Sequence, residues 1–390
     1  MASLVAVNAA GPAPVQLRMA QPNEVGSSLA EALSGGPPIA PLPVDPVERA
    51  RVITMLRPTE PVIQADAAAV IATSGSTGAP KGVVLSRAAI RASVEATHQR
   101  LGGIGDWVLA LPMHYVAGFM VLARACLAGT QAVPVRSDLS ELPGVVAGSS
   151  RRYISLVSTQ LDRALSRAEV AAALASFSAV LVGGGPVSQA LVERAHDVGI
   201  KVVPTYGMSE TCGGCVYDGR PLQDVDIDIA QDDRILIRST ALFSGYRLRP
   251  DLTEDAIVDG WFRTQDRGRW QAGRLVVFGR TDDIVITGGH KVDLGEVERC
   301  VQRWAAERDA GAVVLGIPDA VWGTLIIAVS DWAGSLDDLQ GAVCKSLPMY
   351  AMPRELIHLD PLPLLASGKP DRVAIRSMIM KKLAERQAPV

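Results

Sequence analysis

The chain has 390 residues, of which 48% are hydrophobic and 20% are charged; it is long enough for about two or three packed units and too apolar to be intrinsically disordered. Lysine and arginine total 38 against 41 acidic residues, and the formal net charge of −3 leaves no basic excess for neutralising a phosphate backbone, which argues against nucleic acid binding. The 5 cysteines are too few and too scattered for a secreted disulfide framework, and the N-terminus lacks the pattern of an export signal, so we expect a cytoplasmic protein.

The first segment, residues 1 to about 60, is rich in alanine, proline and glycine. This composition predicts an abbreviated, loosely structured lead-in with one helix. We expect little of the chemistry to lie there.

From residue 66 onward, short β-prone apolar runs alternate with helical stretches. The predicted strands cover residues 67–72, 107–111, 153–157, 179–182 and 201–204, and the predicted helices between the later strands cover residues 159–174 and 187–198. This alternation favours an α/β fold with a doubly wound parallel sheet and helices on its faces. Such a sheet binds its ligands at the carboxyl ends of its strands.

The longest apolar stretch, residues 107–127, is long enough to raise the question of a membrane span. Pro112, His114 and Arg124 interrupt it. We therefore predict a strand, a loop and a buried helix there, and no membrane span.

The hydrophobic pattern changes over residues 225–278, where polar and apolar residues alternate as in antiparallel strands. A compact tail of strands and helices follows from residue 284. We predict an N-terminal lead-in over residues 1–60, and a large domain of layered sheets and helices over residues 61–281 with its β-rich part at about 220–280. A small, mobile α+β domain completes the chain over residues 282–390.

The sharpest local feature is the loop at residues 73–82, Thr-Ser-Gly-Ser-Thr-Gly-Ala-Pro-Lys-Gly, which directly follows a predicted strand. Glycines let backbone amides approach an anion, hydroxyls add donors, and a lysine adds a positive charge, so the composition suits a polyphosphate. It is not a Walker A loop, because Lys81 precedes a glycine. Taken alone, it could also be a flexible surface turn.

Together with four later motifs, this loop resembles the adenylate-forming superfamily of acyl-CoA synthetases and adenylation domains. The other motifs are Tyr-Gly-Met-Ser-Glu-Thr at residues 206–211, Gly-Trp-Phe-Arg-Thr-Gln-Asp at 260–266, Gly-Arg-Thr-Asp-Asp at 279–283 and Ser-Gly-Lys at 367–369. All five occur in the order typical of that superfamily, which makes the match far more specific than any one motif.

The resemblance implies an enzyme, an AMP-forming acid–thiol ligase that uses ATP, Mg²⁺ and coenzyme A. A carboxylate must approach a polyphosphate in such a reaction, so the site has to screen the repulsion between two anions. By resemblance, Glu210 would hold the metal, and Lys369 would be the catalytic lysine that reaches the acyl carboxylate and the α-phosphate. Read alone, both could be ordinary surface residues. The phosphates would be held by Thr73, Ser74, Gly75, Ser76, Thr77, Gly78 and Lys81.

The resemblance also implies where the nucleoside binds. The ring of Tyr206 would stack on adenine, although core packing is an alternative. Asp266 and Arg280 would hold the ribose hydroxyls, because a carboxylate accepts and a guanidinium donates hydrogen bonds. The remaining residues of the implied nucleotide site are Gly183, Gly184, Gly185, Gly207, Ser209 and Thr211.

Transfer of the acyl group to coenzyme A needs the same acyl carbon that Lys369 would cover during adenylation. In similar enzymes the small domain rotates about a hinge, which corresponds here to Asp282. Cys212 and Cys215 have the spacing of a zinc or redox pair, but no second pair accompanies them, and we interpret them as either incidental or lining the pocket.

Two further segments, residues 111–119 and 154–161, resemble the o-succinylbenzoate–CoA ligases of menaquinone biosynthesis. That resemblance places His114 over the acyl pocket as a second catalytic residue, and it makes Arg124, Arg151 and Arg152 candidates for binding a second substrate carboxylate. The implied pocket wall consists of Ser155, Thr159, Gln160, Gly207 and Met208.

Three alternatives stay open at this point. They are another aryl- or acyl-CoA ligase, an adenylation enzyme that serves a carrier protein, and a catalytically silent nucleotide-binding protein. A homodimer, common in the superfamily, is the oligomeric state that the resemblance suggests.

Overall fold

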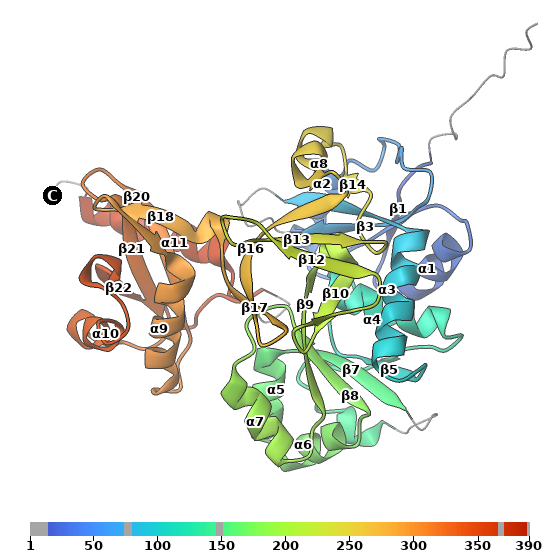
Figure 1. Ribbon diagram of the computed structural model, residues 1–390, viewed down its shortest axis with the longest axis horizontal. Helices are drawn as coiled ribbons and strands as arrows, with labels where there is room; N and C mark the ends of the chain where they lie inside the picture. Colours follow the sequence, from blue (N-terminus) through green and yellow to red (C-terminus); the bar gives the residue numbers. More distant parts are fainter. Residues whose placement is uncertain (1–14, 74–79, 146–150, 366–369, 388–390) are drawn as a thin grey trace, which may run out of the picture. The chain divides into compact units, whose positions relative to one another are not determined.

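The structure is a computed structural model that describes residues 15–73, 80–145, 151–365 and 370–387 (Figure 1). The chain forms two compact units. The first extends to Gly260 except for residues 227–237, which belong with residues 261–390 in the second unit. In the described residues, no helix combines the length and the apolar character that a membrane span requires.

The N-terminal segment contributes two of the five strands of the first sheet. Its strands follow the order β1 (Arg18–Ala20), β2 (Ile39–Pro41), β3 (Ala67–Thr73), β4 (Lys81–Ser86) and β14 (Gly245–Tyr246). Helices α1 (Val25–Leu33) and α2 (Pro46–Leu56) connect the first three strands, and α8 (Pro250–Ala256) follows β14.

The prediction of a loose lead-in with one helix is therefore wrong for the described part of residues 1–60. Val25, Leu29 and Leu33 recur every four residues along α1 and are buried. This spacing gives the helix one apolar face, which packs into the core.

The second sheet has seven strands in the order β11-β10-β9-β8-β7-β5-β6. The strands are β5 (Asp106–Leu109), β6 (Val133–Pro134), β7 (Arg152–Val157), β8 (Ala179–Gly183), β9 (Val202–Met208), β10 (Gly213–Tyr217) and β11 (Arg220–Pro221). The pairings from β6 to β9 are parallel, which confirms the parallel sheet predicted from the sequence. Strand β10 pairs antiparallel with β9.

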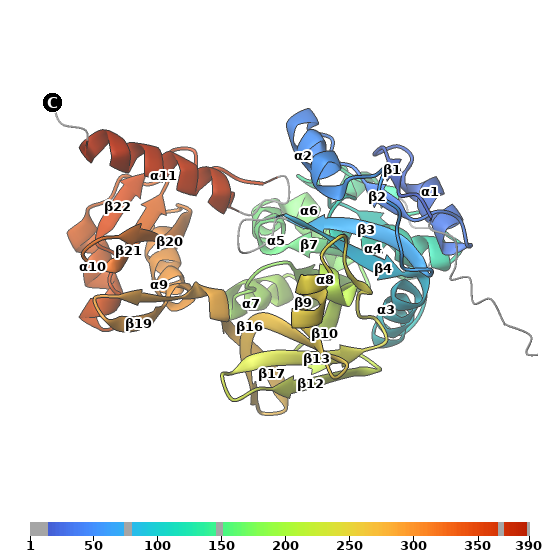
Figure 2. The same cartoon turned by 90° about the horizontal axis from the view of Figure 1, so that it is seen from above.

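Helices cover both faces of this sheet (Figures 1 and 2). On one face, α5 (Ser158–Leu165), α6 (Ala168–Ala175) and α7 (Gln189–Asp197) share an apolar cluster with Val108, Ile154 and Val180. On the other face, α4 (Val116–Leu127) packs with Trp107 and Tyr153. Helix α3 (Arg87–Arg100) contacts β4 of the first sheet and β10 of the second. The first unit is thus layered as predicted, and residues 107–127 form a strand, a loop and a buried helix.

The second unit begins with antiparallel strands. β12 (Val225–Ile229) and β13 (Arg234–Ser239) each cross the division between the units, and β15 (Ile257–Val258) belongs to the first unit. Within the second unit, β16 (Trp261–Gln271) pairs antiparallel with β13 and with β17 (Arg274–Arg280). This confirms the β-rich segment predicted from the alternating pattern.

The remainder of the second unit is an α+β structure, as predicted. Its strands are β18 (Ile284–Thr287), β19 (His290–Asp293), β20 (Ala312–Asp319), β21 (Gly323–Ser330) and β22 (Glu355–His358). Helices α9 (Leu294–Ala306) and α10 (Leu336–Val343) pack on one face of β20 and β21, and α11 (Arg372–Gln387) packs on the other face (Figure 2). The second unit starts well before Asp282, so the hinge at that residue stays a prediction.

Candidate active site

The carboxyl edge of the seven-stranded sheet gathers residues from four predicted segments. His114 follows β5, Thr159 follows β7, Gly184 follows β8, and Glu210 follows β9. Because these strands are parallel, their carboxyl ends meet at one edge of the sheet, which is where α/β folds bind ligands. Gly207 is required on this edge for steric reasons, since a Cβ there would lie 2.0 Å from the carbonyl oxygen of Gly213.

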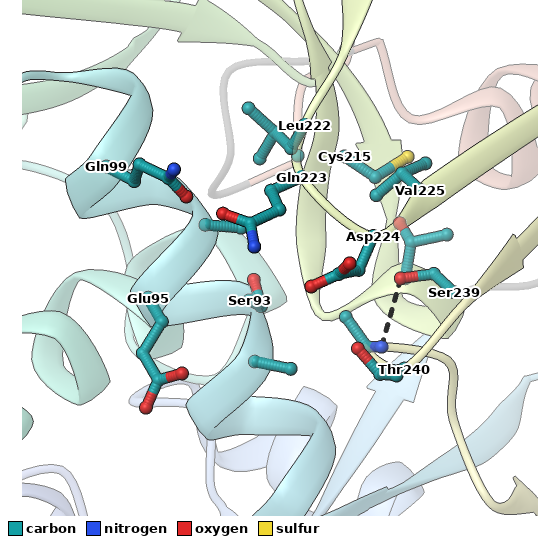
Figure 3. Close-up of a pocket in the computed structure, with 15 residues that line it drawn as sticks. Ser93, Glu95, Gln99, Cys215, Leu222, Gln223, Asp224, Val225, Ser239 and Thr240 are labelled. Atoms are coloured by element: carbon teal, nitrogen blue, oxygen red, sulfur yellow. Dashed lines mark hydrogen bonds between the residues drawn. The ribbon is translucent and has the colours of Figure 1, made fainter.

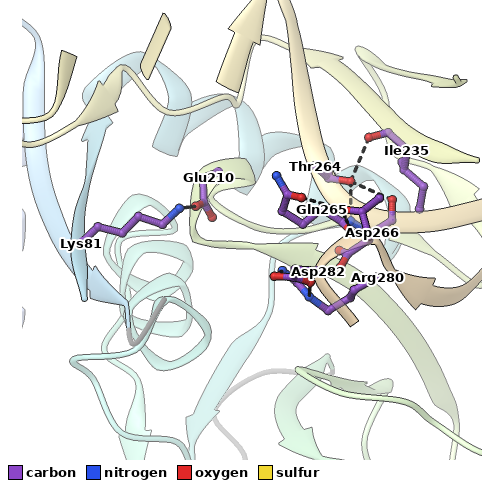
Figure 4. Close-up of polar contacts among 9 residues, drawn as sticks. Lys81, Glu210, Ile235, Thr264, Gln265, Asp266, Arg280 and Asp282 are labelled. Carbon is purple, nitrogen blue, oxygen red and sulfur yellow. Dashed lines mark hydrogen bonds and ion pairs between the residues drawn. The ribbon is translucent and has the colours of Figure 1, made fainter. Parts of the chain in front are cut away.

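Glu210 forms the centre of a buried polar cluster (Figure 4). Its side chain lies in the short 3₁₀ turn η2 (Ser209–Thr211), and the residue is only 8% exposed. The hydroxyl of Tyr246 donates a hydrogen bond of 2.8 Å to Glu210 Oε1, and the Nζ atom of Lys81 lies 3.8 Å from the same oxygen. Lys81 Nζ also lies 4.0 Å from the centroid of the Tyr246 ring. Two residues from separate predicted motifs, Lys81 and Glu210, are thereby brought together.

Tyr246 is the member of this cluster that the sequence analysis missed. It is 5% exposed and packs against Phe243, with ring centroids 4.8 Å apart. Burial raises the pKa of Tyr246, and the charge of Glu210 raises it further. The phenol therefore keeps its proton and remains a donor at neutral pH. A Gly-Tyr pair in an apolar segment was the only available signal, and it does not reveal a contact with Glu210.

The turn after Glu210 is fixed by the hydroxyl of Thr211. The backbone N–H of Met208 donates to Thr211 Oγ1 at 2.9 Å, and this hydroxyl lies 2.6 Å from the carbonyl oxygen of Gly213. Cys212 then adopts a left-handed conformation with φ of 49°. Cys212 and Cys215 are buried free thiols, and in the described residues no group of three or more potential metal ligands exists.

The predicted ribose-binding pair also meets, within the second unit (Figure 4). Arg280 Nη1 donates to Asp266 Oδ1 at 2.7 Å, while Nε and Nη2 donate to the two carboxylate oxygens of Asp282 at 2.8 and 2.9 Å. Burial alone would lower the pKa of Arg280, but the hydrogen bond with Asp282 and the charge of Asp266 raise it. The Thr264 hydroxyl accepts the backbone N–H of Asp266 at 3.0 Å and so fixes the backbone at this acid.

The residues predicted to form the acyl pocket differ in their surroundings. Ser155 is buried within β7, whereas Thr159 is exposed at the start of α5. The amide group of Gln160 donates to the carbonyl oxygens of Ala110 and Ser137, at 3.0 and 2.9 Å, and its oxygen accepts the N–H of Val157. Gln160 therefore holds neighbouring loops together. His114 is buried, and burial lowers its pKa to about 4, so its imidazole is neutral at pH 7.

The three candidate arginines occupy contrasting positions. Arg151 precedes β7 and Arg152 begins it, so both lie at its amino end, opposite the edge that carries the site. Arg124, on α4, is 3% exposed, and its guanidinium lies 4.9 Å from the centroid of the Trp107 ring. It neighbours the Glu210 turn, since a Cβ on Gly213 would lie 4.0 Å from Arg124 Nη2. Within the described chain, Arg124 Nε has no hydrogen-bond partner and no carboxylate pairs with the guanidinium.

A cavity of about 420 Å³ lies in the first unit, next to the turn that carries Glu210 and Thr211. Figure 3 shows the residues that line it. Helix α3 forms one wall, and β10 with the two following loop segments forms the other. The lining includes Ser93, Glu95, Gln99, Thr211, Cys215, Gln223, Asp224 and Ser239. Of the residues that the sequence placed at the nucleotide site, only Thr211 lines this cavity among the described residues, together with Cys215, the candidate pocket residue.

Several predicted site residues lie outside the described residues. They are Ser74, Gly75, Ser76, Thr77, Gly78 and Lys369. Thr73 and Lys81, which flank the loop, pair across the hairpin of β3 and β4, and the Thr73 hydroxyl donates to the carbonyl oxygen of Lys81 at 3.3 Å.

Comparison with known proteins identifies the family. The model of the AMP-binding enzyme family matches residues 9–246. The chain belongs to the AMP-binding enzyme family. This confirms the superfamily, the fold class and the type of enzyme that the five motifs predicted.

Members of the AMP-binding family that resemble this chain include named CoA ligases. A probable 2-succinylbenzoate–CoA ligase of Mycobacterium tuberculosis (strain ATCC 25618 / H37Rv) is 40% identical over 362 residues, which are 89% of this chain and 93% of that protein. The 2-succinylbenzoate–CoA ligase of Enterococcus faecalis is 31% identical over 337 residues, 77% of this chain and 67% of that protein. Among solved structures, o-succinylbenzoate CoA synthetase (MenE) from Bacillus subtilis, in complex with ATP and magnesium ion, has a TM-score of 0.69 at 28% identity, covering 81% of this chain and 71% of its own.

Proposed function

We propose that this protein is an ATP- and Mg²⁺-dependent ligase that converts o-succinylbenzoate to its acyl adenylate and then to o-succinylbenzoyl-CoA, a step of menaquinone biosynthesis. The observation that carries the proposal is the 40% identity to a probable 2-succinylbenzoate–CoA ligase over almost the full length of both chains. The B. subtilis synthetase is named in complexes with ATP and magnesium and with the acyl-adenylate intermediate OSB-AMP, which fits the adenylation half-reaction.

In the first half-reaction, a carboxylate oxygen of the acid attacks the α-phosphorus of ATP. The bond between that phosphorus and the bridging oxygen to the β-phosphorus breaks, and pyrophosphate leaves. In this proposal, residues 73–78 and Lys81 bind the phosphates, and the Lys369 ammonium would interact with the acyl carboxylate and the α-phosphate. These cations stabilise the negative charge that builds up between the two anions.

Glu210 suits a metal-binding role on the evidence of its surroundings. Tyr246 orients Oε1, while Oε2 accepts no hydrogen bond within the described chain. Carboxylate oxygens are the ligands that Mg²⁺ prefers. The bound ion would offset part of the polyphosphate charge, and Lys81, 3.8 Å from Glu210, adds a second positive charge at the same place.

The nucleoside part of ATP is held by Tyr206, Gly183, Gly184, Gly185, Gly207, Ser209 and Thr211. In this proposal, Asp266 accepts the ribose hydroxyl protons. Arg280, which donates to Asp266 Oδ1 at 2.7 Å, orients that carboxylate. Asp282 serves as the hinge that allows the second half-reaction, in which the thiol sulfur of coenzyme A attacks the acyl carbon and AMP leaves.

Arg124 is the residue that we assign to the second carboxylate of o-succinylbenzoate. A buried guanidinium without a carboxylate partner is costly. A carboxylate of the substrate would supply the missing charge and fill the donor sites through a bidentate pair. The aromatic part of the acid then lies among His114, Ser155, Thr159, Gln160, Gly207 and Met208.

Three finer points belong to the same proposal. Coenzyme A is the acyl acceptor, and the protein works as a homodimer, which light scattering would test. We place the reaction in the cytoplasm because all of the cysteines are free thiols, as in a reducing compartment.

The test is incubation of the purified protein with ATP, Mg²⁺, coenzyme A and a panel of acids that contains o-succinylbenzoate, benzoate and a fatty acid, with products identified by mass spectrometry. We expect o-succinylbenzoyl-CoA as the main thioester. Thioester only on another acid would overturn the substrate. Adenylate without thioester would favour a carrier-protein enzyme, and absence of pyrophosphate release with every acid would favour a nucleotide-binding protein without catalysis.

A further inference from the structure

Helix α2 brings an acidic side chain from the N-terminal segment to the predicted acyl site. Glu48 Oε1 lies 3.7 Å from His114 Nε2 and accepts a hydrogen bond of 3.1 Å from the hydroxyl of Tyr115. All three residues belong to the first unit. Little chemistry was expected in residues 1–60, and the sequence pattern did not predict the contact of Glu48 with His114.

The start of α2 is held firmly, which fixes where Glu48 lies. Asp45 caps the helix by accepting the backbone N–H of Glu48 at 2.7 Å, and Pro46 occupies its first position. Both features are typical of stable helix starts. Arg49 adds two hydrogen bonds to the carbonyl oxygens of Pro43 and Val44. The Glu48 carboxylate is therefore presented by a rigid element.

His114 needs an acceptor at the position that Glu48 occupies. Its Nε2 atom is buried and has no hydrogen-bond partner among the residues that the structure describes. A neutral imidazole carries one N–H, which is costly to bury without an acceptor. Glu48 Oε1 is near enough for a small rotation of either side chain to form the hydrogen bond. Such a bond would place the proton on Nε2 and leave Nδ1 as an acceptor.

We infer that Glu48 is a positioning residue, which orients His114 and fixes its tautomer at the acyl pocket. The same carboxylate holds Tyr115, the residue that precedes α4, so it also sets the position of the loop on which His114 lies. The inference rests on the proposed acyl-binding role of His114. It gives the N-terminal segment a part in recognising the acid, separate from the binding of ATP.

A double-mutant cycle tests this inference, using the acid that the wild-type protein activates. Glu48→Ala should lower kcat/KM for the acid about 10-fold, the effect of losing one hydrogen bond to a charged group, and leave KM for ATP unchanged. Glu48→Gln, whose amide oxygen can still accept, should recover most of this loss. Added to His114→Ala, the Glu48→Ala change should have little further effect, because both remove the same interaction. Arg51→Ala, an exposed change on the same helix, is the matched control and should change neither constant.

A second measurement does not depend on turnover. Nitrogen-15 NMR of histidine-labelled protein, which has only 5 histidines, should report the Nε2–H tautomer for His114 in the wild type and a changed tautomer population in Glu48→Ala. Additive effects in the cycle together with unchanged His114 signals would overturn the inference. If the acid activated is not o-succinylbenzoate, the proposed substrate fails, whereas the coupling between Glu48 and His114 is still measured.

Discussion

The hydroxyl of Tyr246 offers a direct test of how the Glu210 cluster works. Tyr246→Phe removes one hydrogen bond of 2.8 Å to a buried carboxylate and keeps the ring that lies beneath the Lys81 ammonium and against Phe243. Hydrogen bonds to charged groups contribute about 1.5–3 kcal/mol. At about 1.4 kcal/mol for each factor of ten, the loss of this hydrogen bond corresponds to a reduction of roughly 10- to 100-fold in rate. We expect this reduction in kcat/KM for MgATP in the adenylation half-reaction.

The assay separates binding from folding. Pyrophosphate release reports adenylation, calorimetry reports the affinity for MgATP, and thermal unfolding reports stability. The matched control is Tyr217→Phe, because Tyr217 is also buried and, among the described residues, its hydroxyl bonds only to the Thr97 hydroxyl, at 3.1 Å. The control should lose stability and keep its affinity for MgATP.

A role of Tyr246 in orienting Glu210 would be refuted if Tyr246→Phe and Tyr217→Phe lost similar stability and both kept wild-type adenylation. Tyr246 would then support the fold and would not orient Glu210. Tyr246→Leu, which also removes the ring, should reduce adenylation further than Tyr246→Phe, since Lys81 loses the aromatic face over which it lies.

Three further predictions follow from the proposed site. Lys369→Ala should slow adenylate formation at least about 10²-fold, while MgATP binding measured by calorimetry persists. Unchanged adenylation would contradict the catalytic role of Lys369. Arg124→Met should raise KM for o-succinylbenzoate and not for a benzoate that lacks the second carboxylate, and an equal rise for both acids would argue against the assignment. Burial lowers the pKa values of His98 and His114 from 6.5 to about 4. Between these two values the unfolded state binds more protons than the folded state, so the free energy of unfolding should fall as the pH drops from 6.5 to 4. His98→Gln should reduce this pH dependence, as measured by thermal unfolding.

The parallel sheet could be predicted because its strands carry the pattern locally. Strand β8 is a continuous apolar run, and β7 is apolar after Arg152 except for Ser155, a pattern typical of strands buried on both faces. The N-terminal strands β1 and β2 contain only 3 residues each, too few for a period of two to be visible. These two strands form because neighbouring strands of the first sheet provide their hydrogen-bond partners. The three residues of each strand do not by themselves indicate that pairing.

The site was predicted in part for the same reason. Motifs of consecutive residues, such as the one that ends in Glu210 and Thr211, could be found directly from the sequence. Tyr246 and Glu48 could not, because each reaches the site through a pairing or packing contact between distant segments. Tyr246 lies opposite Val83 in the pairing of β14 with β4, and no spacing within either segment indicates that register.

The arrangement around Glu210 also explains why two sheets are needed for one site. The first sheet supplies Lys81 and Tyr246, and the second supplies Glu210 at the end of β9. At 3.8 Å the Lys81 ammonium is farther from Glu210 Oε1 than in a direct hydrogen bond, so the two charges offset each other only in part. In the proposed site, the two sheets therefore bring a cation and a carboxylate together without a direct hydrogen bond between these two groups, so that the ammonium can act on the phosphates while the carboxylate acts on the metal.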